Sequence, residues 1–128
     1  MPKPSTHRLG DLQLKILKVL WDRPDAAVAD VLQHIQHPTR LAYTTVATML
    51  RKMESRGLVG HRTVGRTFLY RAKVTADEVS HSISTHWVER LFGGSLTQAV
   101  NHLLETRKLT RKELDQLERL IAERKKKS

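Results

Sequence analysis

Hydroxyl and cationic side chains gather on one side of residues 42–57, a segment that we predict to be helical. At helical spacing, the polar members of this face are Thr44, Thr48, Arg51, Lys52 and Ser55. The face carries no carboxylate, so it can approach an anionic polymer and donate hydrogen bonds to base edges and phosphates. The same pattern also fits an ordinary amphipathic surface helix, and the neighbouring elements must decide between the two.

The opposite side of segment 42–57 is apolar, as a helix docked on a core requires. Its apolar side chains recur at i, i+3, i+4 and i+7 and are Val46, Met49, Leu50 and Met53. Gly57 predicts the end of the helix, because glycine enters the left-handed region without steric cost.

Two shorter apolar patterns precede this segment and predict helices over residues 9–21 and 26–36. Pro24 separates them, because proline cannot continue a helix. The second helix has a weak N-cap, since Ala27 offers no side-chain acceptor. A short turn at residues 37–41 then leads into segment 42–57, which gives the dimensions of a helix-turn-helix.

Residues 58–74 predict a β-hairpin after the three helices. We expect strands at 58–63 and 66–72 joined by a turn at Val64-Gly65, with Phe68 and Tyr70 on one face. Three helices followed by such a hairpin form a winged helix. Arg62 and Arg66 flank the predicted turn, which makes the tip suitable for contacting phosphates.

The rest of the chain, from residue 75 onward, predicts three helices with clear starts. Three [ST]-x-x-[EQ] capping boxes begin at Thr75, Ser95 and Thr110, each ahead of an apolar pattern. About 50 residues cannot enclose so many large apolar groups alone, so we expect two chains to share them in a twofold dimer. The predicted interface consists of Val79, Ile83, Trp87, Leu91, Leu96, Val100, Leu103, Leu104, Leu117 and Ile121.

The predicted fold is therefore mainly α. A winged helix-turn-helix over residues 9–74, with three helices and a β-hairpin wing, precedes a three-helix dimerisation region over residues 75–122. Residues 1–8 are expected to be disordered, and residues 123–128 form a basic tail.

The charge of the chain supports an anionic partner. Lys and Arg outnumber Asp and Glu by 23 to 13 over 128 residues, which gives a net charge of +10. Most of this excess lies in the first 74 residues, so double-stranded DNA is the expected partner and a membrane is not. The chain has no cysteine, no signal peptide and no apolar run long enough to span a bilayer, which fits the cytoplasm.

Patterns typical of enzymes and metal sites are absent from the sequence. There is no phosphate-binding glycine loop and no nucleophile motif, and we expect neither a cofactor nor catalysis. The chain has seven histidines, but Pro38 breaks the spacing of His34 and His37. His81 and His86 are five apart, which does not suit one helical face, so surface histidines are favoured over a metal site.

Several stretches together resemble the penicillinase-repressor family of winged-helix repressors, from about residue 9 to 122. They are Leu9-Gly10-Asp11-Leu12, Tyr43-Thr44-Thr45-Val46, Gly57-Leu58, Gly65-Arg66-Thr67-Phe68-Leu69-Tyr70, Leu91-Phe92-Gly93-Gly94-Ser95-Leu96 and Leu109-Thr110-Arg111-Lys112-Glu113-Leu114. The resemblance implies a homodimeric transcriptional repressor that binds a palindromic operator.

The resemblance also implies roles for individual residues. Thr44, Thr45 and Thr48 would read bases, and Tyr43, Arg51, Lys52 and Arg66 would lie on or near the DNA backbone. Arg40 and Arg62 complete the predicted DNA-binding set.

In several members a signalling protease cuts the dimerisation region and releases DNA. The aligned bond here is His102–Leu103, where the family often has a small polar residue and then Phe. His-Leu departs from that pattern, which argues against cleavage of this chain at that bond. Copper-responsive relatives carry a C-terminal cysteine pair, which this chain lacks.

Three other functions remain open from the sequence. The charge and the lysine tail also fit a sequence-indifferent architectural DNA-binding protein. Some winged helices are protein–protein modules, against which the cationic face argues. A small enzyme would need a constellation of catalytic residues that the sequence does not display.

Overall fold

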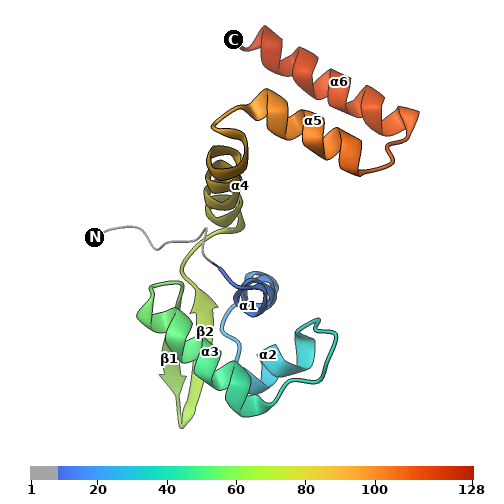
Figure 1. The fold of residues 1–128 in the computed structure, drawn as a ribbon. Helices are drawn as coiled ribbons and strands as arrows, with labels where there is room; N and C mark the ends of the chain where they lie inside the picture. Colours follow the sequence, from blue (N-terminus) through green and yellow to red (C-terminus); the bar gives the residue numbers. More distant parts are fainter. Residues whose placement is uncertain (1–8) are drawn as a thin grey trace. The chain divides into compact units, whose positions relative to one another are not determined.

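The computed structural model describes residues 9–128, and the predicted disorder of residues 1–8 lies outside this range. The described part contains six helices and one antiparallel hairpin (Figure 1). In chain order the elements are α1 (Asp11–Asp22), α2 (Val28–His34), α3 (Tyr43–Ser55), β1 (Val59–Val64), β2 (Thr67–Ala72), α4 (Ala76–Phe92), α5 (Leu96–Thr106) and α6 (Arg111–Lys126). The predicted succession of three helices, a hairpin and three helices is confirmed.

The chain divides into two compact units, one ending at His86 and the other spanning Trp87–Ser128. The division falls inside α4, not at the predicted boundary of residues 74 and 75. The physical reason is that Val79 is buried and Ile83 partly buried against the core of the first unit. The beginning of α4 therefore belongs to the first unit.

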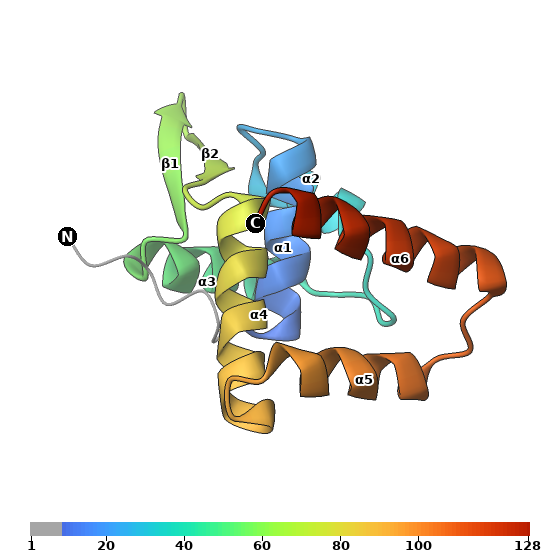
Figure 2. The same ribbon diagram turned by 90° about the horizontal axis from the view of Figure 1, so that it is seen from above.

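The core of the first unit draws on all three helices of the helix-turn-helix and on the first strand. Its largest fully buried side chains are Ile16, Leu17, Leu20, Leu50, Met53, Leu58, Val31, Val46 and Val59. Figure 2 shows α1, α3 and the beginning of α4 from a second direction. The apolar stripes predicted from the sequence thus meet in one cluster.

Helix α2 is shorter than the predicted segment 26–36 because its flanks take other conformations. Ala26 pairs with Tyr70 as in a third strand: the Ala26 N–H donates to the Tyr70 carbonyl at 2.9 Å, and the Tyr70 N–H donates back at 2.8 Å. Ile35 is extended. Ala27 offers no side-chain cap, as predicted, but Asp30 Oδ2 accepts from the Ala27 N–H at 3.0 Å.

Helix α3 ends as the sequence predicts. Gly57 has a φ of +79°, and the following Leu58 N–H donates to the Met53 carbonyl at 3.0 Å. This left-handed turn directs the chain from α3 into the hairpin, with Leu58 and Val59 fully buried beneath the junction.

The hairpin pairs Val59 with Ala72 and Val64 with Thr67, so its two-residue turn is Gly65-Arg66. The predicted turn at Val64-Gly65 was wrong by one residue. Gly65 has a φ of +62°, and turns of type II′ require glycine at the first central position, which fixes the observed register. Arg66 consequently lies in the turn itself.

The second unit contains the antiparallel helices α5 and α6 (Figures 1 and 2). All three predicted N-caps are confirmed: the hydroxyls of Thr75, Ser95 and Thr110 accept from the backbone N–H three residues later, at 3.1, 3.2 and 3.1 Å. Helix α6 continues to Lys126, into the segment that we had expected to be a tail. Within residues 87–128 of this chain, Ala99 alone is buried.

Candidate nucleic-acid interface

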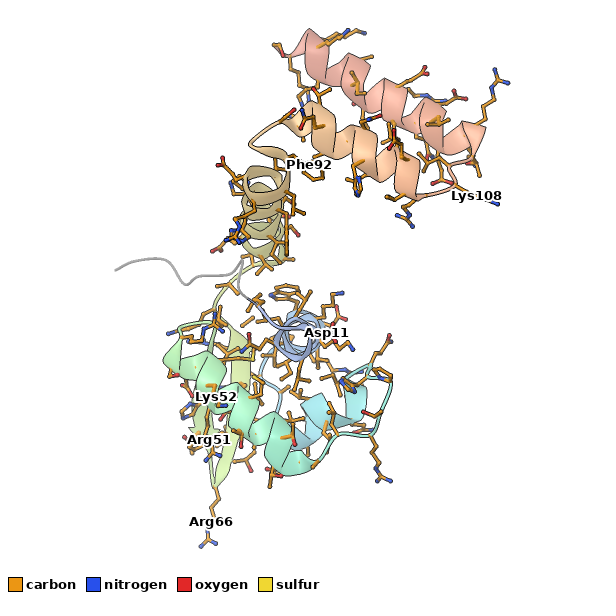
Figure 3. The ribbon with its side chains drawn as sticks, in the orientation of Figure 1. Asp11, Arg51, Lys52, Arg66, Phe92 and Lys108 are labelled. Carbon is orange, nitrogen blue, oxygen red and sulfur yellow. The ribbon has the colours of Figure 1, made fainter. Side chains whose placement is uncertain are left out.

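The outward face of α3 carries the predicted polar set. Thr44, Thr45, Thr48, Arg51, Lys52 and Ser55 are all exposed, whereas Val46, Leu50 and Met53 on the other side are fully buried. Helix α3 thus packs on the core with its apolar side and presents hydroxyls and cations to solvent. Figure 3 labels Arg51 and Lys52 on this helix.

Within this face, Arg51 Nη2 donates to Thr48 Oγ1 at 3.3 Å. The contact connects one cation to the middle of the hydroxyl row, so the guanidinium and the hydroxyl lie together on the surface. Glu54, the one acidic residue of α3, is turned toward the wing and receives a contact from His61. The polar face of α3 therefore remains free of negative charge.

Arg66 extends from the tip of the wing, as Figure 3 shows. Its neighbours Val64 and Phe68 are half-exposed apolar residues. Arg62 lies closer to the base of the hairpin and pairs through Nε with Asp25 Oδ1 at 3.3 Å. This ion pair joins β1 to the turn before α2, so Arg62 has a structural contact that the sequence did not predict.

A cleft of about 510 Å³ lies between α3, the start of α2 and the wing. Tyr43, Ala47 and Arg51 line it from α3, Ala27, Val28 and Ala29 from the other helix, and Arg66, Thr67, Phe68 and Tyr70 from the hairpin. Small alanine side chains leave room between walls that carry two arginines. This combination suits a sugar–phosphate strand, which needs cations and close approach of the backbone.

Two predicted contacts lie at the edges of this surface. Arg40 is exposed in the loop between α2 and α3, and Tyr43 opens α3 with 54% of its surface exposed. Ala42 occupies the N-cap of α3 and makes no side-chain hydrogen bond. The first N–H groups of α3 therefore have no capping side chain from the N-cap residue.

Gln13 connects α1 to α3 and was not predicted. Its Oε1 accepts from the Gly10 N–H and from Arg56 Nη1, both at 3.1 Å, and its Nε2 donates to Met49 Sδ at 3.4 Å. Met49 lies near the middle of α3, and Arg56 is the C-cap residue of the same helix, two turns later. A single amide thus holds the C-terminal half of the helix against α1.

The second unit presents most of the predicted dimer interface to solvent. Exposed large side chains are Trp87, Leu91, Leu96, Val100, Leu103, Leu104, Leu114, Leu117, Leu120 and Ile121. The structure corrects the prediction that Val79 lies in the dimer interface. Val79 is only 2% exposed because it packs into the core of its own chain, and Ile83 packs against the same core. Neither of these two side chains presents a free interface.

The bond between His102 and Leu103 lies in the middle of α5. Both residues are exposed, and the His102 ring lies 5.7 Å from the Phe92 ring. A helical peptide must unwind locally before it can enter a protease cleft as an extended strand.

Other classes of site find little support in residues 9–128. No three His, Asp or Glu side chains of this range come together as metal ligands would. No helix in the described chain is both long and apolar enough to cross a membrane.

The sequence of the chain matches a known protein family. The family model described as "Penicillinase repressor" matches residues 9–123. The chain is 24% identical over 118 residues to the penicillinase repressor of Bacillus licheniformis, covering 92% of each protein. It is 15% identical over 106 residues to that of Staphylococcus aureus, covering 83% of this chain and 84% of the relative.

Solved structures of bacterial regulators are also similar. The solution structure of monomeric Bacillus licheniformis BlaI in complex with the blaP half-operator aligns with a TM-score of 0.49 and 23% identity, covering 61% of this chain and 93% of that one. A MarR family protein from Bacillus stearothermophilus aligns with a TM-score of 0.48 and 18% identity, covering 94% and 75%. The match of the family model extends across both units of the chain.

Proposed function

The chain belongs to the penicillinase-repressor family, and from this premise we propose that it represses transcription as a homodimer bound to a palindromic operator. Membership makes it a sequence-specific DNA-binding repressor and not an enzyme. The proposal adds which residues contact DNA, how two copies assemble and what form the operator takes. We also propose that it acts in the cytoplasm, where bacterial DNA is accessible.

The observation that supports the DNA-binding residues best is the two-sided character of α3. Val46 and Leu50 are fully buried, while Thr44, Thr48 and Lys52 face outward. In this proposal the threonines meet base edges in the major groove and the cations meet phosphates. Arg66 at the wing tip and Tyr43 at the start of α3 contact the backbone on either side of the groove.

The homodimer is supported by the apolar surface of the second unit. Leu103 and Ile121 are 61% and 57% exposed in the single chain, and they belong to regular apolar rows along α5 and α6. Contiguous apolar faces of this kind mark interaction surfaces. A second copy is the simplest occupant, because it would cover identical faces on both chains at once.

Two copies related by a twofold axis would present two α3 helices to one duplex. Their half-sites would then be inverted repeats, separated by about one helical turn of DNA or a multiple of it. Occupation of such a site would exclude the transcription machinery. Release by a signalling protease would require cleavage at His102–Leu103, where the residue types depart from the family pattern.

Selection of bound DNA from a random pool tests the operator, and light scattering of the full chain tests the dimer. We expect an inverted repeat and a mass of two chains. A single asymmetric motif or a lone chain would contradict the assembly. Equal binding to every sequence would instead favour the architectural alternative.

Thr48→Val tests base reading, because valine has nearly the same shape and lacks the hydroxyl. We expect the variant to lose about 1 kcal/mol on the selected site and nothing on random DNA. Thr85→Val on α4 is the matched control, since Thr85 is also an exposed helical threonine. Equal losses on both kinds of DNA would show that Thr48 does not read bases.

A further inference from the structure

A histidine of the wing is bound to the acidic residue of the recognition helix. The ring of His61 on β1 places Nδ1 2.8 Å from Oε1 and 2.7 Å from Oε2 of Glu54 on α3. Both side chains are about one-third exposed or less, 27% for His61 and 33% for Glu54. This is a short contact between an imidazole nitrogen and the side-chain carboxyl group of Glu54.

The wing supports this histidine from the other side. The His61 ring stacks on Phe68 of β2 with centroids 4.0 Å apart and planes inclined by 14°. Tyr70 lies next along the strand, with its centroid 5.6 Å from that of His61. The pKa of the Tyr70 phenol is raised, mainly by burial and to a smaller extent by the negative charge of Glu54. Glu54 therefore interacts with Tyr70 as well as with His61.

Between His61 and Leu69, across the turn, no residue of the hairpin is buried. Val59, Gly60 and Tyr70 are buried, whereas every residue from Arg62 to Phe68 is exposed. Arg62 contacts Asp25 on the opposite face of the strand. The contact between His61 and Glu54 is therefore the outermost described link between the wing and α3 before the turn that carries Arg66.

We propose that His61 and Glu54 are positioning residues, which hold the wing at the distance from α3 at which Arg66 and the α3 cations reach the same duplex. The inference rests on the proposed phosphate contact of Arg66. Without the contact between His61 and Glu54 the tip of the hairpin leaves this position and Arg66 no longer neutralises its phosphate, so the contact adds affinity through Arg66 without itself touching DNA. Neither residue belonged to the DNA-binding set predicted from the sequence.

Substitutions of His61 separate its stacking on Phe68 from its hydrogen bond to Glu54. His61→Phe keeps a ring that can stack on Phe68 and removes the donor to Glu54. His61→Asn keeps a donor near the position of Nδ1 and removes the ring. His81→Phe on α4 is the control, because His81 is exposed and lies on a different element.

The assay measures affinity of the full chain for a random-sequence duplex between about 50 and 200 mM salt, a range over which lost phosphate contacts change the slope of the logarithmic plot. We expect Arg66→Ala and His61→Phe each to reduce this slope by about 0.9, the value for one phosphate contact. The double variant should show no further reduction, because both changes remove the same contact. His61→Asn and His81→Phe should keep the original slope.

The results distinguish this inference from the function on which it rests. If Arg66→Ala leaves the slope unchanged, the wing contact of the proposed function fails and the inference fails with it. If Arg66→Ala lowers the slope and His61→Phe does not, the inference alone is wrong. Additive reductions in the double variant would also overturn it, and so would a loss in His61→Asn equal to that in His61→Phe.

Discussion

Replacing Val79 with alanine tests whether the beginning of α4 belongs to the core of the first unit. Val79 is 2% exposed and packs in the same cluster as Val74, which is 3% exposed. Each buried methylene contributes about 0.8 kcal/mol, so the two lost carbons cost about 1.6 kcal/mol. Incomplete relaxation of the cavity raises the total to about 2 kcal/mol.

Thermal unfolding followed by circular dichroism measures the effect. For a unit of this size, about 2 kcal/mol corresponds to a fall in Tm of about 10 °C. Val64→Ala is the matched control, because Val64 is 49% exposed on the wing and the same atoms are removed. We expect its Tm to remain within about 2 °C of the original, since substitutions at exposed positions rarely exceed about 0.5 kcal/mol.

Protein concentration separates a core position from an interface position. Loss of a core contact lowers stability equally at all concentrations, whereas loss of a dimer contact is offset as concentration rises. The reasoning is refuted if Val79→Ala unfolds at the same temperature as Val64→Ala. It is also refuted if the destabilisation by Val79→Ala disappears at high protein concentration, because Val79 would then act at the interface, as the sequence had suggested.

Three further substitutions test other features of the fold. Trp21→Phe removes the 2.9 Å hydrogen bond from the indole Nε1 to the Val74 carbonyl and should lower the free energy of unfolding in urea by about 1 kcal/mol. Gly57→Ala places a Cβ at a φ of +79° and should cost about 1–2 kcal/mol in the same assay. A hydrogen bond from Lys15 and its charge hold the pKa of Asp11 below its ordinary value, so this stabilisation is present above the ordinary pKa and is lost as pH falls through the lowered one. Asp11→Asn should therefore differ from the original protein at neutral pH and converge with it in acid.

Features determined by neighbouring residues could be predicted from the sequence. The α3 helix has an apolar stripe three and four residues apart, and Gly57 supplies the left-handed residue after it. The three helix starts in the second half depend on hydroxyls that accept from an N–H three residues later. Both kinds of signal lie within one or two helical turns, which is why the sequence alone reveals them.

Features determined by distant residues could not be predicted in the same way. Val79 follows a helical apolar pattern that is identical whether the partner surface is a second chain or α1 and the rest of the core. Ala26 leaves the helical pattern because Tyr70, far along the chain, offers both a donor and an acceptor. In each case a tertiary contact selects between local structures that the sequence allows equally.

The position of the hairpin turn was predicted one residue too early for a different reason. Moving a two-residue turn by one position changes every cross-strand pair, while the alternation of Phe68 and Tyr70 stays the same. The alternating pattern therefore identifies the strands and cannot by itself fix their register. The fixed register brings His61 opposite Tyr70 and beside Phe68, and so creates the cluster that meets Glu54.

Helix α1 occupies the central position in the first unit, although it carries none of the predicted DNA-binding residues. Near its start, Gln13 binds Met49 and Arg56 on α3, and near its end Trp21 binds the Val74 carbonyl just before α4. Its buried side chains Ile16, Leu17 and Leu20 fill the core between these two contacts. Helix α1 therefore links α3 to the chain just before α4. In the function proposed above, α1 supports the helix that meets DNA and has no contact of its own with the duplex.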